Sequence, residues 1–173
     1  MYISSIHLKN FRTFRDAKID FVHPNQNFDS KVFPLPKPKY PNINLLLGNN
    51  GSGKTTLLKA IALASLGPLI DDAGIPIYRL IRQEQGESTV SKGRRADINA
   101  QFVPSDLELR TVKERGWISN DYSGLIESSS AITKLGDIER IRWGGETDWL
   151  ESFWFPIFEE DTSLYFTLGY GAT

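Results

Sequence analysis

The chain has 173 residues and a mass of 19.5 kDa, with 40% apolar and 24% charged residues, which suits one globular core and is short for two. Its formal net charge of −1 and pI near 6.1 exclude a global attraction to nucleic acid or to an anionic membrane surface. Because cysteine is absent, disulfides, thiol nucleophiles and thiolate metal sites are excluded. The two histidines, His7 and His23, cannot by themselves make a transition-metal site.

The amino terminus carries no positively charged segment followed by a long apolar core. No run in the chain approaches ~18 apolar residues, the length that a membrane-spanning helix needs. We therefore expect a soluble, cytoplasmic protein with no membrane partner.

Two alternating segments open the chain. Apolar residues alternate with polar ones over 6–9 and again over 17–21, which predicts two short strands flanking 10–15 as a hairpin. Residues 22–42 follow with five prolines and many polar side chains. This composition predicts a surface loop.

The next segments predict a phosphate-binding site. The apolar run Ile43–Leu47 is typical of a buried strand, and residues 55–64 predict a helix packed on one face. Between them stands Gly48-Asn49-Asn50-Gly51-Ser52-Gly53-Lys54-Thr55, which matches GxxxxGK(S/T), the phosphate-binding loop (P-loop). Strand, glycine turn and helix thus occur in the order that the motif requires.

The residue types in this loop suit a nucleotide triphosphate. Glycines let successive N–H groups point inward, and the helix behind the loop adds its positive end. We expect Lys54 to reach the β- and γ-phosphates and the Thr55 hydroxyl to coordinate Mg²⁺. The predicted ATP contacts are Asn49, Asn50, Gly51, Ser52, Gly53, Lys54, Thr55 and Thr56, with Lys54 also the predicted catalytic residue and Thr55 the metal ligand.

The second half of the chain is less regular. A short helix is expected over 77–83, and alternation predicts strands over 96–103 and 138–143, the latter ending in a Gly144–Gly145 turn. Residues 104–136 carry only weak periodicity and are left unassigned. The run 163–171 is typical of a central strand, which would normally lead to a covering element, so we expect an incomplete domain.

Three stretches carry a family resemblance. The opening Ile3-Ser4-Ser5-Ile6-His7-Leu8-Lys9-Asn10-Phe11-Arg12-Thr13-Phe14, the segment 43–62 around the P-loop, and the closing Leu168-Gly169-Tyr170-Gly171-Ala172-Thr173 are similar to the amino-terminal half of ABC-type ATPases related to RecF, SMC and OLD proteins. The closing turn resembles the AAA-labelled members of that group. The resemblance covers the whole chain in outline.

This resemblance implies an α/β fold of the P-loop NTPase class, with an ABC-ATPase-like mixed sheet around the P-loop helix and an added antiparallel β portion, as one domain over residues 1–173. It implies ATP-dependent engagement of a second ATPase domain, coupled to DNA repair or anti-phage defence, with DNA or a nuclease effector as further partners. It also places Arg12 near the nucleotide, where a guanidinium could stack on the adenine or contact a phosphate. An alternative for this turn is a solvated hairpin whose Phe11 or Phe14 fills the core.

The remaining catalytic parts of the family cannot be placed in this sequence. These are the signature loop, the carboxylates that follow an apolar strand, and the switch histidine. Trp154–Asp161 resembles such a strand, but Pro156 argues against it. We therefore expect hydrolysis to need downstream residues or a partner domain, and the isolated chain to be poorly active.

Two other functions remain open. A self-contained P-loop kinase or GTPase would use the same Lys54 and Thr55, although Asp121–Gly124 is a poor match to a GTPase motif and no guanine-reading sequence occurs. A regulatory module that senses ATP without hydrolysing it is the other possibility. A basic cluster of Lys92, Arg94 and Arg95 could meet DNA phosphates, or it could be a solvated loop.

Overall fold

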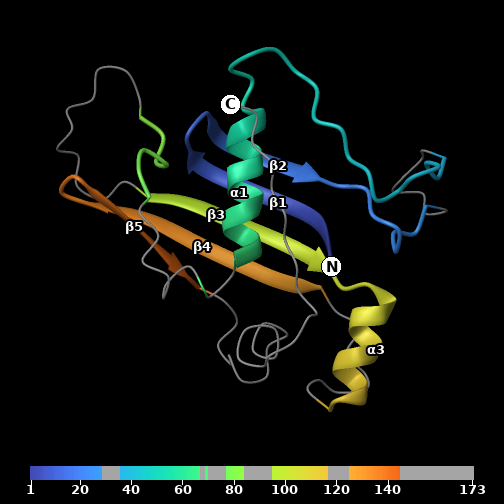
Figure 1. Cartoon of the computed structure of the whole chain (residues 1–173). Coiled ribbons are helices and arrows are strands. Elements are labelled where there is room, and N and C mark those ends of the chain that lie inside the picture. Colours follow the sequence, from blue (N-terminus) through green and yellow to red (C-terminus); the bar gives the residue numbers. More distant parts are fainter. Residues whose placement is uncertain (29–35, 67–68, 70–76, 84–94, 117–124, 145–173) are drawn as a thin grey trace.

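The computed structural model describes residues 1–28, 36–66, 69, 77–83, 95–116 and 125–144 (Figure 1). Its strands form one five-stranded antiparallel sheet in the order β2-β1-β3-β4-β5. The strands are β1 (Tyr2–Phe11), β2 (Phe14–Asp20), β3 (Arg95–Val103), β4 (Ile126–Leu135) and β5 (Ile138–Trp143), and the two described helices are α1 (Lys54–Leu66) and α3 (Asp106–Glu114). Helix α1 crosses one face of the sheet (Figure 1).

Tight turns join the strands at both ends of the sheet. Arg12 and Thr13 connect β1 to β2, while Gly136 and Asp137 connect β4 to β5. The centre of the sheet is a long-range pairing, because β1 lies antiparallel to β3 with Ile6 opposite Ala100 and Leu8 opposite Ile98. The hairpin and both strands predicted from alternation in the second half are therefore confirmed.

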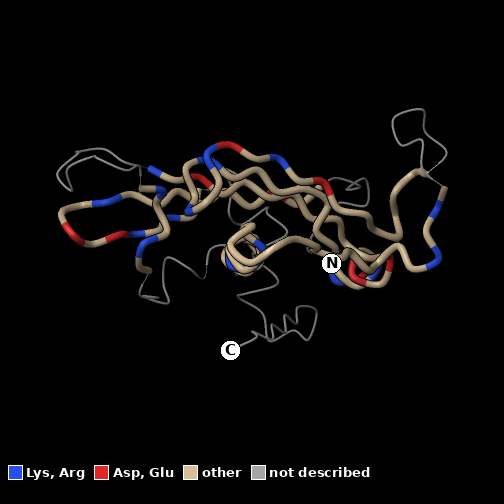
Figure 2. Tube along the Cα trace, turned by 90° about the horizontal axis from the view of Figure 1, so that it is seen from above, with Lys and Arg blue, Asp and Glu red and all other residues tan. Residues whose placement is uncertain are grey.

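The core lies between the sheet and α1. Alternate residues of the central strands, such as Ile6, Leu8 and Ile98, are fully buried. Helix α1 contributes buried Leu57, Ala60 and Ala64, and the hydroxyl of Ser128 on β4 donates to the Ala64 carbonyl at 2.7 Å. Figure 2 shows this arrangement with α1 seen end-on beneath the sheet.

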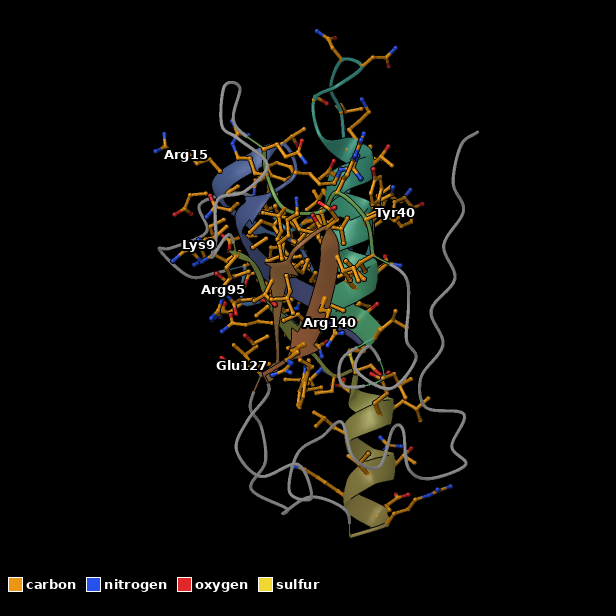
Figure 3. The ribbon with its side chains drawn as sticks, turned by 90° about the vertical axis from the view of Figure 1, so that its left-hand side faces the viewer. Lys9, Arg15, Tyr40, Arg95, Glu127 and Arg140 are labelled. Atoms are coloured by element: carbon orange, nitrogen blue, oxygen red, sulfur yellow. The ribbon has the colours of Figure 1, made fainter. Side chains whose placement is uncertain are left out.

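The opposite face of the sheet is polar. Lys9, Arg95 and Glu127 project from it, on the side away from α1 (Figure 3). Cross-strand pairs order this face, including His7 Nε2 to Asp16 Oδ1 at 2.7 Å. That hydrogen bond from His7 lowers the pKa of Asp16. The sheet thus has one buried and one open face, as its alternation predicts.

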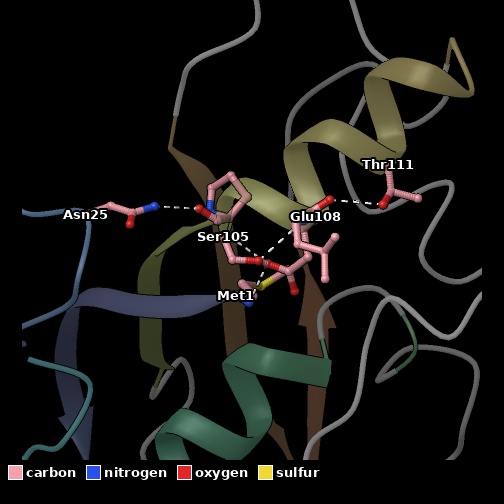
Figure 4. A network of polar contacts seen from close by, with 7 residues as sticks. Met1, Asn25, Ser105, Glu108 and Thr111 are labelled. Atoms are coloured by element: carbon pink, nitrogen blue, oxygen red, sulfur yellow. Dashed lines mark hydrogen bonds and ion pairs between the residues drawn. The ribbon is translucent and has the colours of Figure 1, made fainter. Parts of the chain in front are cut away.

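Helix α3 lies in the region that the sequence analysis left unassigned. Its N-cap is Ser105, whose hydroxyl accepts from the Glu108 N–H at 3.3 Å, while Glu108 Oε2 accepts from the Ser105 N–H at 2.7 Å. This reciprocal capping box satisfies two N–H groups at the helix start. The same Glu108 oxygen lies 2.5 Å from the amino group of Met1, so α3 is tied to the start of β1 (Figure 4).

Two predicted elements are wrong. Residues 43–47 are extended but belong to no strand of the described structure, and Ile43, Leu45 and Leu47 are 56%, 78% and 88% exposed rather than buried. Residues 77–83 form no helix, because Ile81 makes an isolated antiparallel bridge with Phe11 instead. A local pattern could not reveal either outcome, since both depend on which partner the segment meets.

The predicted fold class, an α/β P-loop NTPase with an antiparallel β portion beside the P-loop helix, is confirmed. The sheet is antiparallel throughout the described residues, so the parallel strands of the expected mixed sheet are not among them. The predicted strand at 163–171, the run Trp154–Asp161, the motif Asp121–Gly124 and Gly145 lie outside the described residues. No helix within the described ranges is long and apolar enough to cross a membrane.

Truncating Ile98 tests the core directly. Ile98 is fully buried at the centre of β3, so Ile98→Ala should lower the free energy of unfolding by about 2–5 kcal/mol, the usual cost of such a cavity. Chemical denaturation measures this change. The matched control is the exposed neighbour, Asn99→Ala, which loses only the hydrogen bond that Asn99 Oδ1 accepts from Ser129 Oγ and should lower stability by no more than about 0.5–1.5 kcal/mol. Equal effects of the two substitutions would contradict the assigned faces of the sheet.

His23 should make stability depend on pH. Burial lowers its pKa below the ordinary value of 6.5, so below pH 6.5 the unfolded chain takes up this proton before the folded chain does. The free energy of unfolding should therefore fall as the pH drops from 6.5 toward the pKa of the folded state. His23→Phe should flatten this slope in denaturation curves collected across that range. An unchanged slope in the variant would exclude His23 as its source.

Candidate nucleotide-binding site

The P-loop leads directly into α1. The N–H groups of Gly51, Gly53, Lys54 and Thr55 have no hydrogen-bond partner among the described residues. Helix α1 has no acidic residue in its first turn, so the helix itself supplies no carboxylate against the positive end of its dipole. Free N–H groups and a helix N-terminus together make a site suited to an anion such as a phosphate.

The amino group of Lys54 lies within the loop. Its Nζ donates to the Gly48 carbonyl at 2.6 Å and to the Asn49 carbonyl at 2.8 Å, and it lies 3.5 Å from Ser52 Oγ. A Cβ added to Gly48 would meet Ser52 Oγ at 2.5 Å, so a side chain there would force the Ser52 hydroxyl to move. These hydrogen bonds keep the ammonium group of Lys54 at the loop, where its positive charge could attract a phosphate.

The β1–β2 turn packs on the end of the loop. Gly53 has a φ of +95°, and a Cβ there would lie 2.9 Å from the Phe14 ring and 3.0 Å from Thr13 Oγ1. Only glycine combines this backbone angle with so close an approach. Residues far apart in the sequence therefore meet at Gly53.

Residues 80–82 form hydrogen bonds with the same turn. The Arg12 N–H donates to the Leu80 carbonyl at 2.8 Å, and the Arg82 N–H donates to the Asn10 carbonyl at 2.7 Å. Arg82 also donates through Nη1 to the Thr13 carbonyl at 2.9 Å. Asn10 and Arg12 both have a φ of +49°, an uncommon angle for residues other than glycine. These hydrogen bonds fix the shape of the turn.

A largely apolar pocket of about 340 Å³ adjoins the turn. Its walls come from three segments: the β1–β2 turn, the outer side of α1 and residues 77–80. The lining residues are Arg12, Lys59, Ala62, Leu63, Ile77, Tyr78 and Leu80. The pocket thus includes Arg12, which the family resemblance implied to lie near the nucleotide. It also includes Ile77, Tyr78 and Leu80, which the sequence analysis did not connect to a binding site.

The predicted site residues differ in exposure. Asn49, Asn50, Gly51, Ser52 and Thr55 are exposed, Lys54 is half-buried, and Gly53 is buried. The side chain of Thr56 is buried on α1. A ligand at the loop could therefore meet the backbone N–H of Thr56 more easily than its hydroxyl.

Two further observations concern the other predicted contacts. In the part of the chain that the structure describes, no three His, Asp or Glu side chains cluster as metal ligands. Of the predicted basic cluster, only Arg95 is described, and its Nε lies 2.6 Å from Asp97 Oδ1.

Comparisons with known proteins show the family of the chain. Residues 5–143 match the AAA domain family. The chain is 36% identical over 66 residues to the DNA replication and repair protein RecF of Lactococcus lactis subsp. cremoris (strain MG1363), covering 38% of this chain and 13% of that protein. It is 26% identical over 161 residues to RecF of Synechococcus sp. (strain JA-2-3B'a(2-13)), covering 87% of this chain and 36% of that protein.

Among solved structures, one from work on the ATP-driven dimerization and DNA-stimulated activation of SMC ATPases is similar, with a TM-score of 0.44 and 20% identity over 83% of this chain and 72% of that one. The chain spans about a third or less of the RecF proteins that it matches. The resemblance to RecF-like ATPases inferred from sequence is confirmed, and the chain belongs to the AAA domain family.

Proposed function

We propose that this chain binds ATP with Mg²⁺ through residues 48–56. The observation that carries the proposal is the position of the Lys54 amino group, 2.6 Å and 2.8 Å from two loop carbonyls, in a loop whose last N–H groups have no partner among the described residues. The N–H groups of Gly51, Gly53, Lys54, Thr55 and Thr56 would hold the phosphate oxygens. Asn49, Asn50 and Ser52 would shape the loop mainly through their backbone.

The base would occupy the pocket beside the β1–β2 turn. The pocket shares that turn with Gly53, and its volume of about 340 Å³ lies within the range of small-molecule sites. Arg12 lies in its wall, and a guanidinium plane can stack on a purine. Leu63, Ile77 and Leu80 would supply apolar contacts.

The site also fits a magnesium ion. Thr55 is exposed at the first turn of α1, and a hydroxyl there is a ligand that Mg²⁺ accepts beside water and phosphate oxygens. When bound, the ion would neutralise charge on the phosphates. Lys54 would stabilise the negative charge on the transferring phosphoryl group from the other side, which is the catalytic role proposed for it.

We propose that hydrolysis needs completion by downstream residues or by a partner ATPase domain. The segment 43–47 supports this, because it exposes Ile43, Leu45 and Leu47 while its backbone makes few hydrogen bonds within the described residues. An extended apolar segment of this kind is stable when a neighbouring strand covers it. We propose that the downstream residues or the partner domain supply both the strand that covers this segment and the missing carboxylates.

The pathway is proposed from the relatives. The matched RecF proteins are named for DNA replication and repair, and the SMC structure concerns ATP-driven dimerization and stimulation by DNA. We place this chain in an ATPase of that kind, acting in DNA repair or anti-phage defence, in the cytoplasm, with DNA or a nuclease effector as partner. A P-loop kinase or GTPase and an ATP-sensing module are the alternatives.

Removing the Lys54 amino group tests the phosphate site. Lys54→Ala should weaken Mg-ATP binding about 10- to 100-fold, because hydrogen bonds to charged groups contribute about 1.5–3 kcal/mol. Isothermal titration calorimetry measures the affinity. The control is Lys18→Ala, which removes an exposed lysine of β2 and should leave binding unchanged. Unaltered ATP affinity in Lys54→Ala would refute the site, and a preference for GTP would favour the GTPase alternative.

Turnover by the isolated chain tests the need for completion. The 173-residue chain should bind ATP but release phosphate at a rate close to that of Lys54→Ala, since the carboxylates that activate water are not placed in it. A phosphate-release assay under single-turnover conditions measures this difference. Robust turnover that disappears in Lys54→Ala would mean that the chain is a complete enzyme.

A further inference from the structure

Glu139 on β5 holds a segment that the sequence did not connect to the nucleotide site. Its Oε2 accepts from the Leu80 N–H at 2.7 Å, and its Oε1 lies 3.4 Å from the Ile81 nitrogen, which donates to it. Glu139 is half-buried, and both of its partners are buried. The contact with Leu80 has the length of a strong, charge-assisted hydrogen bond, and the longer contact with Ile81 is weaker.

The held segment forms part of the base pocket. Leu80 lines the pocket through its side chain, and its carbonyl accepts from the Arg12 N–H on the opposite wall. The next residues hold the rest of the turn, because Ile81 pairs with Phe11 and Arg82 donates to the Asn10 and Thr13 carbonyls. Glu139 therefore holds one wall of the pocket directly, and that wall is hydrogen-bonded to the β1–β2 turn that forms a second wall.

The phosphate loop does not depend on Glu139 in the same direct way. The Lys54 contacts run to carbonyls of the loop itself, and α1 is anchored on the sheet through Leu57, Ala60 and Ala64. Among the described residues, the hydrogen bonds of the Glu139 carboxylate run to Leu80 and Ile81 and not to the loop or to α1. Loss of its carboxylate should therefore disturb the base pocket more than the phosphate loop.

We propose that Glu139 is a positioning residue that shapes the base pocket. Through the pocket it sets the contribution of the base to the affinity for the nucleotide, whereas the contribution of the phosphates is set by the P-loop. This inference rests on the proposed ATP-binding function. It makes Glu139 a specificity determinant that does not touch the nucleotide and acts through the backbone of Leu80 and Ile81.

The experiment compares two probes, Mg-ATP and Mg-tripolyphosphate, on the same full chain. Tripolyphosphate carries the phosphates without ribose or base, so it reports on the P-loop alone. In Glu139→Ala, the Kd for ATP should rise about tenfold while the Kd for tripolyphosphate should change less than about twofold. Glu139→Gln keeps one acceptor oxygen and should give an intermediate rise for ATP. The control is Glu127→Ala, an exposed carboxylate of β4 on the open face, which should alter neither affinity.

Each other outcome has a definite meaning. Equal loss of both affinities in Glu139→Ala and Glu139→Gln, or no change in either, would overturn the positioning role. If Glu139→Ala fails to fold by circular dichroism, Glu139→Gln decides between the same outcomes. Wild-type protein that binds tripolyphosphate as tightly as ATP would refute a base pocket while leaving the phosphate site intact. Wild-type protein that binds neither probe would refute the proposed function itself.

Discussion

The contact of the β1–β2 turn with Gly53 is the constraint on which the rest of the site depends. Thr13 and Phe14 approach the glycine so closely that no side chain fits, and the glycine keeps a φ of +95°. This contact joins the β1–β2 turn to the start of α1, and the packing of Leu57, Ala60 and Ala64 joins the rest of the helix to the sheet. The buried face of the sheet, the free N–H groups of the loop and the pocket beside Arg12 therefore keep one relative arrangement, although they come from distant parts of the sequence.

The P-loop and the pocket beside Arg12 are held by different means. Internal hydrogen bonds from Lys54 to the Gly48 and Asn49 carbonyls hold the loop, so its shape is set before any ligand would bind. Contacts between distant segments hold the pocket, with Glu139 at one end and the β1–β2 turn at the other. A change in the sheet can therefore reach the pocket through β5 without passing through the loop.

The sequence predicted the elements whose residue types are dictated locally. The P-loop needs fixed residues, and β1, β2, β3 and β5 alternate clearly. Strand β4 escaped prediction because Ser128 and Ser130 are buried where apolar residues were expected. Helix α3 could have been found from the capping pair Ser105 and Glu108. The segment 43–47 and the residues around Leu80 could not be predicted correctly, because partners elsewhere in the fold decide their structure.

The exposed segment before the P-loop also affects how the chain behaves in solution. Ile43, Leu45 and Leu47 present apolar side chains along an extended backbone, with no charged residue among 42–47. Such a segment is a template for pairing with any other extended chain. Cover for this segment would therefore favour solubility as well as order in the stretch that leads into the P-loop.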